Sequence, residues 1–451
     1  MLMGSFNSSH HEQPRGDEEE EEEEEQDTAA AAALPDLLQT TSHSHLAFPA
    51  PASQPINAIH MRQLVIRCAE LISQSDLGGA HRLVSVLSAN SSPYGDSVER
   101  LLHQLARALF RRLHLMQHHR MSLHNNEEDQ DHHHHHHHHH RNNQDLQALQ
   151  SCYITLNQIT PFIRFCHLTA NQAILEVIDE THHQALHILD FDIMHGLQWP
   201  PFMQALVERH PMLRLRITAT GTDLSLLRRT GDRLLRFAQS LGLHFQFHPL
   251  LLPSTADHPH HLLINTINNS SVINIDEALA VNCVLYLHRL LKDDSDVAVD
   301  SDSIHLFLRS IKALNPTVVT IAEREANHTL ADALDHYTAI FDSLEATLPP
   351  NSRERLAVEQ VWLGREIMDL VAAHEEQRMT IRRGSQRYES WEVMLRSSGF
   401  SNVPLSPFAL SQAKLLLRLH YPSEGYQLHI LNDSFFLGWQ NRPLFWVSSW
   451  H

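Results

Sequence analysis

The sequence predicts an α/β protein with one doubly wound, mainly parallel sheet, a layer of helices and antiparallel strands at one sheet edge. Apolar strand-like segments alternate with amphipathic helical segments between residues 185 and 322, a pattern typical of parallel βαβ units. Leucines recur at helical spacing between residues 59 and 113 and predict the helical layer. Short strand-like segments around residues 438–441 predict the antiparallel edge.

The first 57 residues are low in complexity and strongly acidic. Eight consecutive glutamates, Glu18 to Glu25, precede an alanine run and a mixture of Pro, Ser and His. These residues carry a formal charge of −11, which leaves −8 of the chain's −19 for the rest. Adjacent carboxylates repel one another, and little apolar surface is available for burial. We expect residues 1–57 to form a disordered acidic arm, or in a second interpretation an arm that orders on a partner.

Residues 58–116 predict three amphipathic helices that form a helical cap. Their apolar side chains recur at steps of three and four residues, with breaks at residues 76–79 and 90–93. The same spacing suits a groove for a partner helix, although core packing is the more frequent role of any one leucine. The candidates for cap packing or partner contact are Leu64, Leu71, Leu101, Leu105 and Leu109.

Residues 117–144 are a second low-complexity segment, expected to be an insertion in a tolerant loop. The segment includes nine consecutive histidines, His132 to His140. Such a run can bind nickel or zinc weakly, but nothing in the flanking acidic and Asn-rich sequence fixes a tetrahedral ligand set. We therefore expect no metal site there.

Residues 145–451 predict the α/β core. The expected strands are 185–191, 213–220, 243–247, 279–285 and 317–322, and the expected helices include 223–241, 304–314 and a long stretch over 331–372. Pro200 and Pro201 suit the first turn of a helix that follows the first strand. Residues 427–450 are expected to add the antiparallel strands, with Trp439, Trp446 and Trp450 packing them.

The most distinctive segment runs from His187 to Pro200, where the first strand leaves the sheet at its carboxyl end. Ligands of doubly wound folds bind at that place. Asp190 and Asp192 are two residues apart and would face the same way on an extended backbone, as an acid/base pair or metal ligands. The favoured interpretation is that they cap the next helix or bond backbone amides of the turn. We expect His187 to be hydrogen-bonded within the sheet and Trp199 to pack in the core.

Composition excludes several classes of protein. The four cysteines show no CxxC pairing and are expected to be reduced, mostly buried thiols. No apolar run of about eighteen residues predicts a membrane span, and the N-terminus lacks the pattern of a secretory signal. Because the chain is acidic, contact with DNA would be local or made through a partner.

These motifs resemble those of the GRAS family of plant transcriptional regulators, in the same order along the chain. Residues 59–115 resemble the first leucine-rich region of that family and residues 213–241 the second, while residues 315–325 resemble a weakened PFYRE region and residues 357–360 an RVER-like run. The residues of the VHIID-like motif are His187, Ile188, Leu189, Asp190, Asp192, Gly196, Gln198 and Trp199. Those of the SAW-like region are Trp391, Gly399, Phe400, Trp439, Ser449 and Trp450.

The resemblance spans residues 58–451 and implies a Rossmann-like, methyltransferase-like sheet with an α-helical cap. It also implies a nuclear protein that forms homo- or heterodimers, binds other transcription factors and GRAS proteins, and contacts DNA directly or through a partner. Asn282-Cys283 and the VEQVW stretch at residues 358–362 most resemble the Lateral suppressor branch, which implies a role in axillary meristem initiation.

The main alternative is an S-adenosylmethionine-binding protein or methyltransferase. Such a cofactor needs a glycine-rich turn after the first strand and an acidic residue at the end of the second. The turn here offers only Gly196, and the second strand ends in residues 218–221 with Asp223 slightly later. The sequence therefore predicts no cofactor and no enzyme, and no Ser-His-Asp or Cys-His arrangement is assigned.

Overall fold

The computed structural model describes residues 58–122, 135–180, 183–252, 277–290, 300–325, 330–372 and 391–451. The chain divides into two compact units, residues 1–55 and 56–451, and every described residue belongs to the second. The acidic-arm prediction for residues 1–57 falls outside the described residues. None of the described helices is both long and apolar enough to cross a lipid bilayer.

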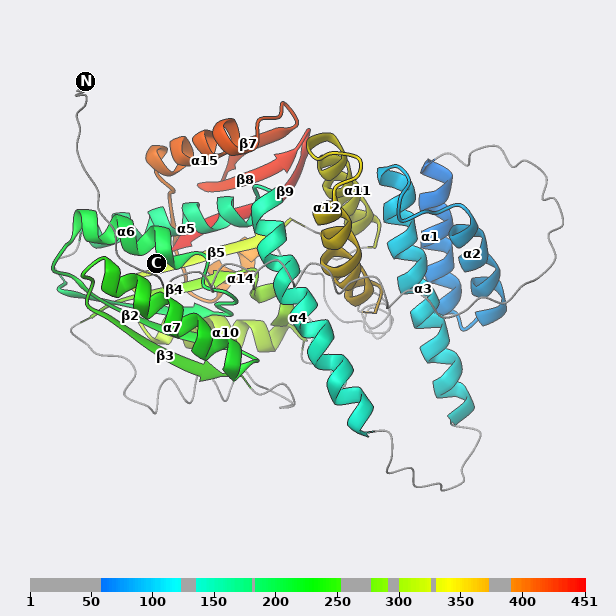
Figure 1. Ribbon diagram of the computed structural model, residues 1–451, viewed down its shortest axis with the longest axis horizontal. Coiled ribbons are helices and arrows are strands. Elements are labelled where there is room, and N and C mark those ends of the chain that lie inside the picture. The colour runs from blue at the N-terminus through cyan, green and yellow to red at the C-terminus, as the bar shows by residue number, and fades with distance from the viewer. Residues whose placement is uncertain are drawn as a thin grey trace, which may run out of the picture. The chain divides into compact units, whose positions relative to one another are not determined.

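One mixed sheet of nine described strands runs through the second unit, in the order β3-β2-β1-β4-β5-β9-β8-β7, with β6 paired to β9 (Figure 1). The parallel strands are β1 (Ala185–Phe191), β2 (Arg214–Gly221), β3 (Phe245–Leu251), β4 (Ala278–Val284) and β5 (Val318–Arg324). The antiparallel strands are β6 (Asn402–Val403), β7 (Tyr426–Leu431), β8 (Ser434–Trp439) and β9 (Arg442–Trp450). The predicted α/β fold, with antiparallel strands at one edge of a mainly parallel sheet, is confirmed.

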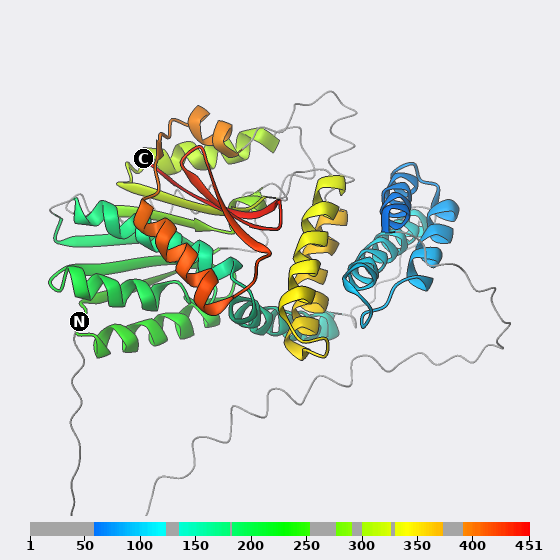
Figure 2. The same cartoon turned by 90° about the horizontal axis from the view of Figure 1, so that it is seen from above.

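Helices cover both faces of the parallel strands (Figure 2). One face packs on α5 (Phe162–Asp179), α6 (Trp199–Arg209) and α7 (Leu224–Ser240), and the other on α9 (Leu287–Leu290), α10 (Asp300–Ala313) and α14 (Trp391–Ser397). Because β-strand side chains alternate between faces, Ile188 joins the first of these cores and Leu189 the second. All seven residues of β1 and of β4 are buried, as expected for central parallel strands.

Local sequence signals set the boundaries of α6 and α7. Pro200 and Pro201 occupy the first turn of α6, where a missing N–H costs nothing. The Asp223 side chain accepts hydrogen bonds from the amides of Ser225 and Leu226 at the start of α7, and Gly242 follows the helix with a φ of +69°. The expected strand over 243–247 begins two residues later, at Phe245.

The helical layer contains more of the chain than residues 58–116. Helices α1 (Ala58–Ser73), α2 (Leu77–Ala89) and α3 (Ser97–Ser122) share one core with α11 (Leu330–Thr347), the π-helical segment η3 (Val358–Leu363) and the end of α4 (His135–Ile159). The short helix α12 (Arg353–Ala357) leads directly into η3. The views in Figures 1 and 2 both place α11 beside α1 and α3. The helical stretch expected over 331–372 is interrupted at residues 348–352, where Pro349 and Pro350 cannot continue α11.

The boundaries predicted for the His-rich insertion are wrong at both ends. Helix α3 continues through Ser122, and α4 begins at His135 within the histidine run. Residues 123–134 lie outside the described part of the chain. Residues 117–122 contain only one apolar side chain, Met121, but Gln117, Arg120 and Met121 are good helix formers, so α3 extends beyond the leucine pattern.

Candidate functional site

The candidate site lies at the carboxyl end of β1, beside the neighbouring strands β2 and β4. Asp190, the penultimate residue of β1, is buried. Its Oδ2 atom accepts a hydrogen bond of 2.8 Å from the indole Nε1 of Trp199. Its Oδ1 atom accepts one of 2.8 Å from the amide Nδ2 of Asn282 on β4. The carboxyl group is thus held between the first residue of α6 and the adjacent strand.

Buried amides extend this contact into a network. Gln198 Nε2 donates to Asn282 Oδ1 at 3.0 Å, and Asn282 Nδ2 donates back to Gln198 Oε1 at 3.1 Å. Asn171 of α5 donates to the Gln198 carbonyl oxygen at 2.9 Å and accepts from Gln198 Nε2 at 3.1 Å. Thr320 of β5 donates to Asn282 Oδ1 at 2.9 Å. We call Asp190, Trp199, Gln198, Asn282, Asn171 and Thr320 the polar lock, because they tie α5, α6 and three strands together.

Burial changes the acidity of Asp190. Desolvation raises its pKa from 3.8 to about 7, against the opposing effect of the hydrogen bonds from Asn282 and Trp199. The negative charge of nearby Asp192 adds to the rise. A carboxyl group in this state exchanges protons near neutral pH, which is a property of many functional sites but also of buried structural carboxyls.

The turn after β1 has an unusual backbone. Asp192, Met194 and Gly196 have φ values of 65°, 50° and 62°, in the left-handed region that favours glycine. A Cβ atom on Gly196 would lie 2.9 Å from Thr230 Cγ2 of α7. The single glycine of the turn therefore allows α7 to pack closely, and its open side is already filled by protein.

Two interpretations of Asp190 and Asp192 are corrected by these contacts. Asp190 does not cap α6: its carboxylate bonds the side chains of Trp199 and Asn282, and the residue before α6, Gln198, makes no side-chain cap. Asp192 lies beyond the end of β1 with a positive φ, so the alternation expected of an extended strand does not place the two carboxylates together. The backbone amide of Asp192 donates to Thr220 Oγ1 at 2.9 Å.

His187 is hydrogen-bonded inside the sheet, as expected. Its Nε2 atom lies 2.9 Å from Thr218 Oγ1 and its Nδ1 atom 3.3 Å from a guanidinium nitrogen of Arg216. Burial, with the positive charge of Arg216, lowers its pKa to about 3, so the ring is neutral. His195 in the turn has Nε2 at 3.0 Å from the carbonyl oxygen of Gln150. Among the described residues, no group of three or more His, Cys, Asp or Glu side chains could hold a metal ion.

The residues of the SAW-like region pack the antiparallel edge rather than forming a second open site. Trp450 is buried at the end of β9, where its Nε1 donates to Ser448 Oγ at 2.7 Å. Trp439 is buried against Tyr426, with ring centroids 4.9 Å apart. Trp391 begins α14 and is half-buried, Phe400 and Ser449 are buried, and Gly399 follows α14 with a φ of 93°.

The five cap leucines are mainly core residues, and two of them also line a hollow in the surface. Leu71, Leu101, Leu105 and Leu109 are buried and Leu64 is half-buried. Leu101 and Leu105 nevertheless line a hollow of about 200 Å³ between α1, α3 and α11. Its wall is mostly apolar, and we call it the cap groove. Its other lining residues include Ile59, Met61, Val65, Val98, Leu102, Leu334, Asp335 and Asp342.

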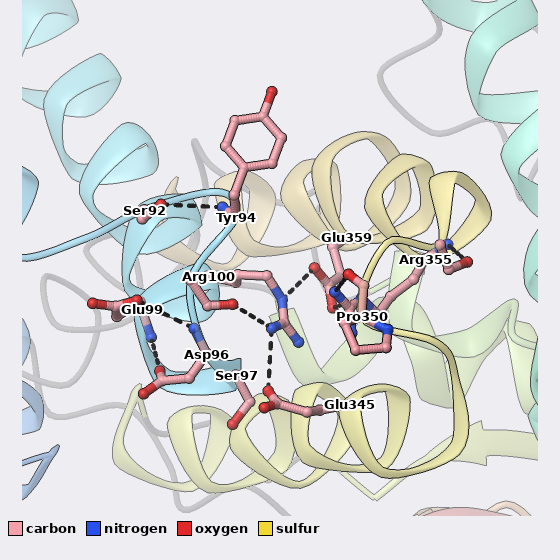
Figure 3. Close-up of polar contacts among 12 residues, drawn as sticks. Ser92, Tyr94, Asp96, Ser97, Glu99, Arg100, Glu345, Pro350, Arg355 and Glu359 are labelled. Atoms are coloured by element: carbon pink, nitrogen blue, oxygen red, sulfur yellow. Dashed lines mark hydrogen bonds and ion pairs between the residues drawn. The ribbon is translucent and has the colours of Figure 1, made fainter.

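A buried ionic cluster within the helical layer joins α3 to α11 and η3 (Figure 3). Arg100 Nε donates to Glu359 Oε2 at 2.9 Å, and Arg100 Nη1 lies 3.1 Å from Glu345 Oε2. Arg355 approaches Glu359 Oε1 to 3.8 Å. The Arg100 and Glu359 side chains are only 3% and 1% exposed. Burial raises the pKa of Glu359 although Arg100 and Arg355 oppose the rise.

The PFYRE-like residues form another set of ion pairs at the carboxyl end of β5. Glu323 Oε2 lies 3.0 Å from His288 Nδ1, and Arg324 pairs with Glu366 at 2.7 Å. Burial alone would raise the pKa of Glu323, but His288 and Arg324 hold it below its ordinary value. This end of the sheet is therefore tied by charges to the helices that follow it.

Sequence reasoning identified Asp190, Gln198 and Trp199 but not the role of their partners. Asn282 was noted only for its resemblance to one branch, and Thr320 and Asn171 were given no role. A usable signal existed: Asn282 is the one strongly polar side chain in a buried strand, ALAVNCV, and a buried amide requires partners. The cluster of Arg100 with Glu359 had no such signal, because its members lie 259 residues apart.

Comparisons with known proteins agree with this geometry. The GRAS domain family model matches residues 61–451. Scarecrow-like protein 18 of Arabidopsis thaliana is 50% identical, over 86% of this chain and 91% of its own length. Protein MONOCULM 1 of Oryza sativa subsp. japonica is 42% identical, over 86% and 88%. The crystal structure of SCL7 in Oryza sativa aligns with a TM-score of 0.66 and 32% identity, over 87% of this chain and 99% of that one. This chain therefore belongs to the GRAS domain family of plant transcriptional regulators.

Proposed function

We propose that this chain is a nuclear regulator of transcription that acts through protein–protein contacts rather than catalysis. The observation that carries the proposal is the contrast between the filled site at the sheet and the open, apolar cap groove. Exposed Ile59 supplies apolar surface at its rim, and the buried Leu101 and Leu105 form part of its wall. An apolar hollow of about 200 Å³ can receive apolar side chains from one face of a partner helix.

The sheet site supports a structural rather than an enzymatic role. An S-adenosylmethionine-type cofactor would need close backbone approach at the turn after β1, but Thr230 occupies the space beside Gly196. It would also need an acidic side chain at the end of β2. Asp223 is the nearest candidate, and its carboxylate bonds the amides of Ser225 and Leu226. The residues present do not fit that cofactor, and the methyltransferase alternative is not favoured.

The biological setting proposed is shoot development, with a role in axillary meristem initiation. The resemblance to the Lateral suppressor branch supports it, as does 42% identity to a rice protein whose name, MONOCULM 1, denotes a single stem. The proposed partners are other transcription factors and GRAS proteins, in homo- or heterodimers. DNA would be contacted directly or through such a partner.

A tethered reporter assay in plant protoplasts tests the proposal. The full chain is fused to a heterologous DNA-binding domain, and transcript from the tethered promoter is measured together with nuclear fluorescence. We expect the chain to enter the nucleus and change transcript level severalfold. Ile59→Asp, at the groove rim with 66% exposure, should abolish the change, because it places a charge where an apolar partner surface must dock.

Leu419→Asp provides the matched control. Leu419 lies on α15 (Pro407–His420), outside the cap groove, and is 60% exposed. The Leu419→Asp variant therefore changes the charge and the exposed apolar surface as much as Ile59→Asp does, but outside the groove. An unchanged reporter with the unmodified chain would contradict the regulatory function. Equal losses in the two variants would contradict the assignment of the groove.

A further inference from the structure

Helix α7 carries a concentration of positive charge that the proposed function does not use. Its seventeen residues include four arginines and one carboxylate, Asp232. All four arginines are exposed: Arg228, Arg229, Arg233 and Arg236. In a chain with a formal charge of −19, such a local excess of positive charge is unexpected.

Three of these arginines lie on one side of the helix. Arg229, Arg233 and Arg236 have the i, i+4, i+7 spacing that brings side chains onto a common face. Leu227, Leu234 and Ala238 define the buried side, about half a turn away from them at 3.6 residues per turn. The span from Arg229 to Arg236 is about 10 Å at 1.5 Å per residue. We call Arg229, Arg233 and Arg236, together with Arg228 about a quarter turn away around the helix, the arginine face.

Asp232 lies among these arginines on the helix surface and offsets part of their charge. None of the four arginines forms an ion pair with a described carboxylate. The one contact is from the Arg233 guanidinium to the backbone carbonyl oxygen of His195, in the turn after β1. Although Arg233 is exposed as a residue, partial burial of its guanidinium, followed by the positive charge of Arg236, lowers its pKa.

Exposed ion-pairing partners are plentiful elsewhere on the surface. Arg67, Arg365 and Arg396 each pair with a carboxylate three or four residues away on the same helix. On α7 the one carboxylate, Asp232, lies three residues from Arg229 and four from Arg228 and Arg236, but among the described residues no ion pair joins it to any of them. The four arginines therefore keep an excess of positive charge that an external anion can bind.

We propose that the arginine face of α7 binds an acidic peptide segment of a partner protein. Guanidinium groups hold carboxylates through paired hydrogen bonds, and a length of about 10 Å matches two turns of a helix or a short extended peptide. The surface is separate from the cap groove in sequence and in lining residues. It adds to the proposed function without depending on it.

An acidic peptide fits this face better than nucleic acid does. Proteins that bind duplex DNA through its phosphates commonly use many cationic contacts spread along a surface. Here four arginines are confined to one helix, and the remaining charge of the chain repels a long polyanion. A short peptide meets the local positive charge while it interacts weakly with the rest, because surface charges are screened beyond about 10 Å.

Fluorescence anisotropy with the full chain and a fluorescein-labelled octaglutamate peptide tests the proposal. We expect saturable binding that weakens when ionic strength rises from about 0.05 M to about 0.3 M. The variant Arg229→Glu/Arg236→Glu should lower the affinity by about tenfold or more. Arg233 is left unchanged because it contacts His195. The neutral variant Arg229→Gln/Arg236→Gln should show a smaller loss in the same direction.

The matched control is Arg82→Glu/Arg418→Glu. Both residues are exposed, on α2 and α15, and the control changes the net charge by the same amount. The proposal is supported if this control retains its affinity for the peptide while the α7 variants lose theirs. The melting temperature of the α7 variants must be unchanged. Equal loss in both double variants would overturn it, as would absence of peptide binding. If the peptide does not bind but a DNA duplex of about 20 base pairs does, and if that binding requires the arginines, the face would be assigned to nucleic acid instead.

Discussion

The sheet centre and the helical layer both bury polar side chains, but they do so with different chemistry. The polar lock joins neutral amides, a hydroxyl and an indole to one carboxyl group, and its donors and acceptors are matched within about 3 Å. The ionic cluster joins Arg100 and Arg355 to Glu359 and Glu345, and it leaves Arg100 Nη2, Arg355 Nε and Glu359 Oε1 without a hydrogen bond. The first network is complete, whereas the second is held partly by charge alone.

This difference indicates that the sheet centre is a rigid scaffold, whereas the helical layer can change its geometry slightly. A satisfied buried network fixes one geometry, because any movement breaks several hydrogen bonds at once. A charged cluster next to an apolar groove tolerates small movements, since Coulomb attraction depends weakly on direction. The π-helical turn that carries Glu359 belongs to a class of helix distortion that is frequent at functional sites. Partner binding in the helical layer is consistent with that pattern.

The largest effect is expected from Arg100→Met. Removing the guanidinium leaves Glu359 buried with Arg355 at 3.8 Å as its remaining ion pair, and we expect a loss of about 3–5 kcal/mol in the free energy of unfolding. Urea denaturation at pH 7 measures it. The double variant Arg100→Met/Glu359→Met should recover part of the loss because no unpaired charge remains. A loss no greater than that of Arg82→Met, at an exposed position, would show that the cluster does not stabilise the layer.

The sheet centre should instead respond to pH. Because the pKa of Asp190 is raised from 3.8 to about 7, the folded state prefers the protonated carboxyl. That stabilisation is complete below about pH 4 and is lost as pH rises through about 7. The side chain in Asp190→Asn does not ionise. Relative to that variant, the free energy of unfolding of the unmodified chain should fall by roughly 2–3 kcal/mol between pH 5 and pH 8. Urea denaturation of both proteins across that range measures the difference, and parallel curves would contradict the raised pKa.

Sequence predicted the sheet better than the helical layer, for a physical reason. Strands β1, β2, β4 and β5 alternate with helices at short range, so local hydrophobic patterns were enough to place them within one or two residues. The helical layer combines α1–α3 with α11 and η3, which are more than 200 residues apart along the chain. Periodicity shows that each segment is helical but not which segments pack together.

Within the candidate site, the sequence predicted where the side chains lie but not their hydrogen-bond partners. The position of Asp190 and Trp199 at a strand end followed from the pattern of the chain. The partners of Asp190 did not, because Trp199 and Asn282 lie 9 and 92 residues away along the chain. Nor did the left-handed turn at Asp192 and Met194. Non-glycine residues with such φ values are rare, and sequence patterns give little warning of them.

Trp199→Phe sharpens the comparison with a smaller effect. It removes the indole donor to Asp190 while it retains an aromatic ring, and we expect a cost of about 1–3 kcal/mol. Because that hydrogen bond lowers the pKa of Asp190, its loss should also shift the pH-dependent destabilisation to higher pH. Trp439→Phe is the control, since Trp439 Nε1 is buried without a hydrogen-bond partner in the described structure. Similar costs and similar pH profiles for the two variants would argue against the indole–carboxyl bond.

The smallest effect on stability is expected at the rim of the cap groove. Ile59 is 66% exposed, whereas Leu105 lines the same groove and is 2% exposed. Ile59→Ala should therefore change the free energy of unfolding by less than about 0.5 kcal/mol, and Leu105→Ala should cost about 2–5 kcal/mol. Thermal and urea denaturation of both variants measure these values. If Ile59→Ala were as destabilising as Leu105→Ala, the rim would belong to the core of the layer, and a loss of regulation in groove variants would then reflect unfolding rather than a missing partner.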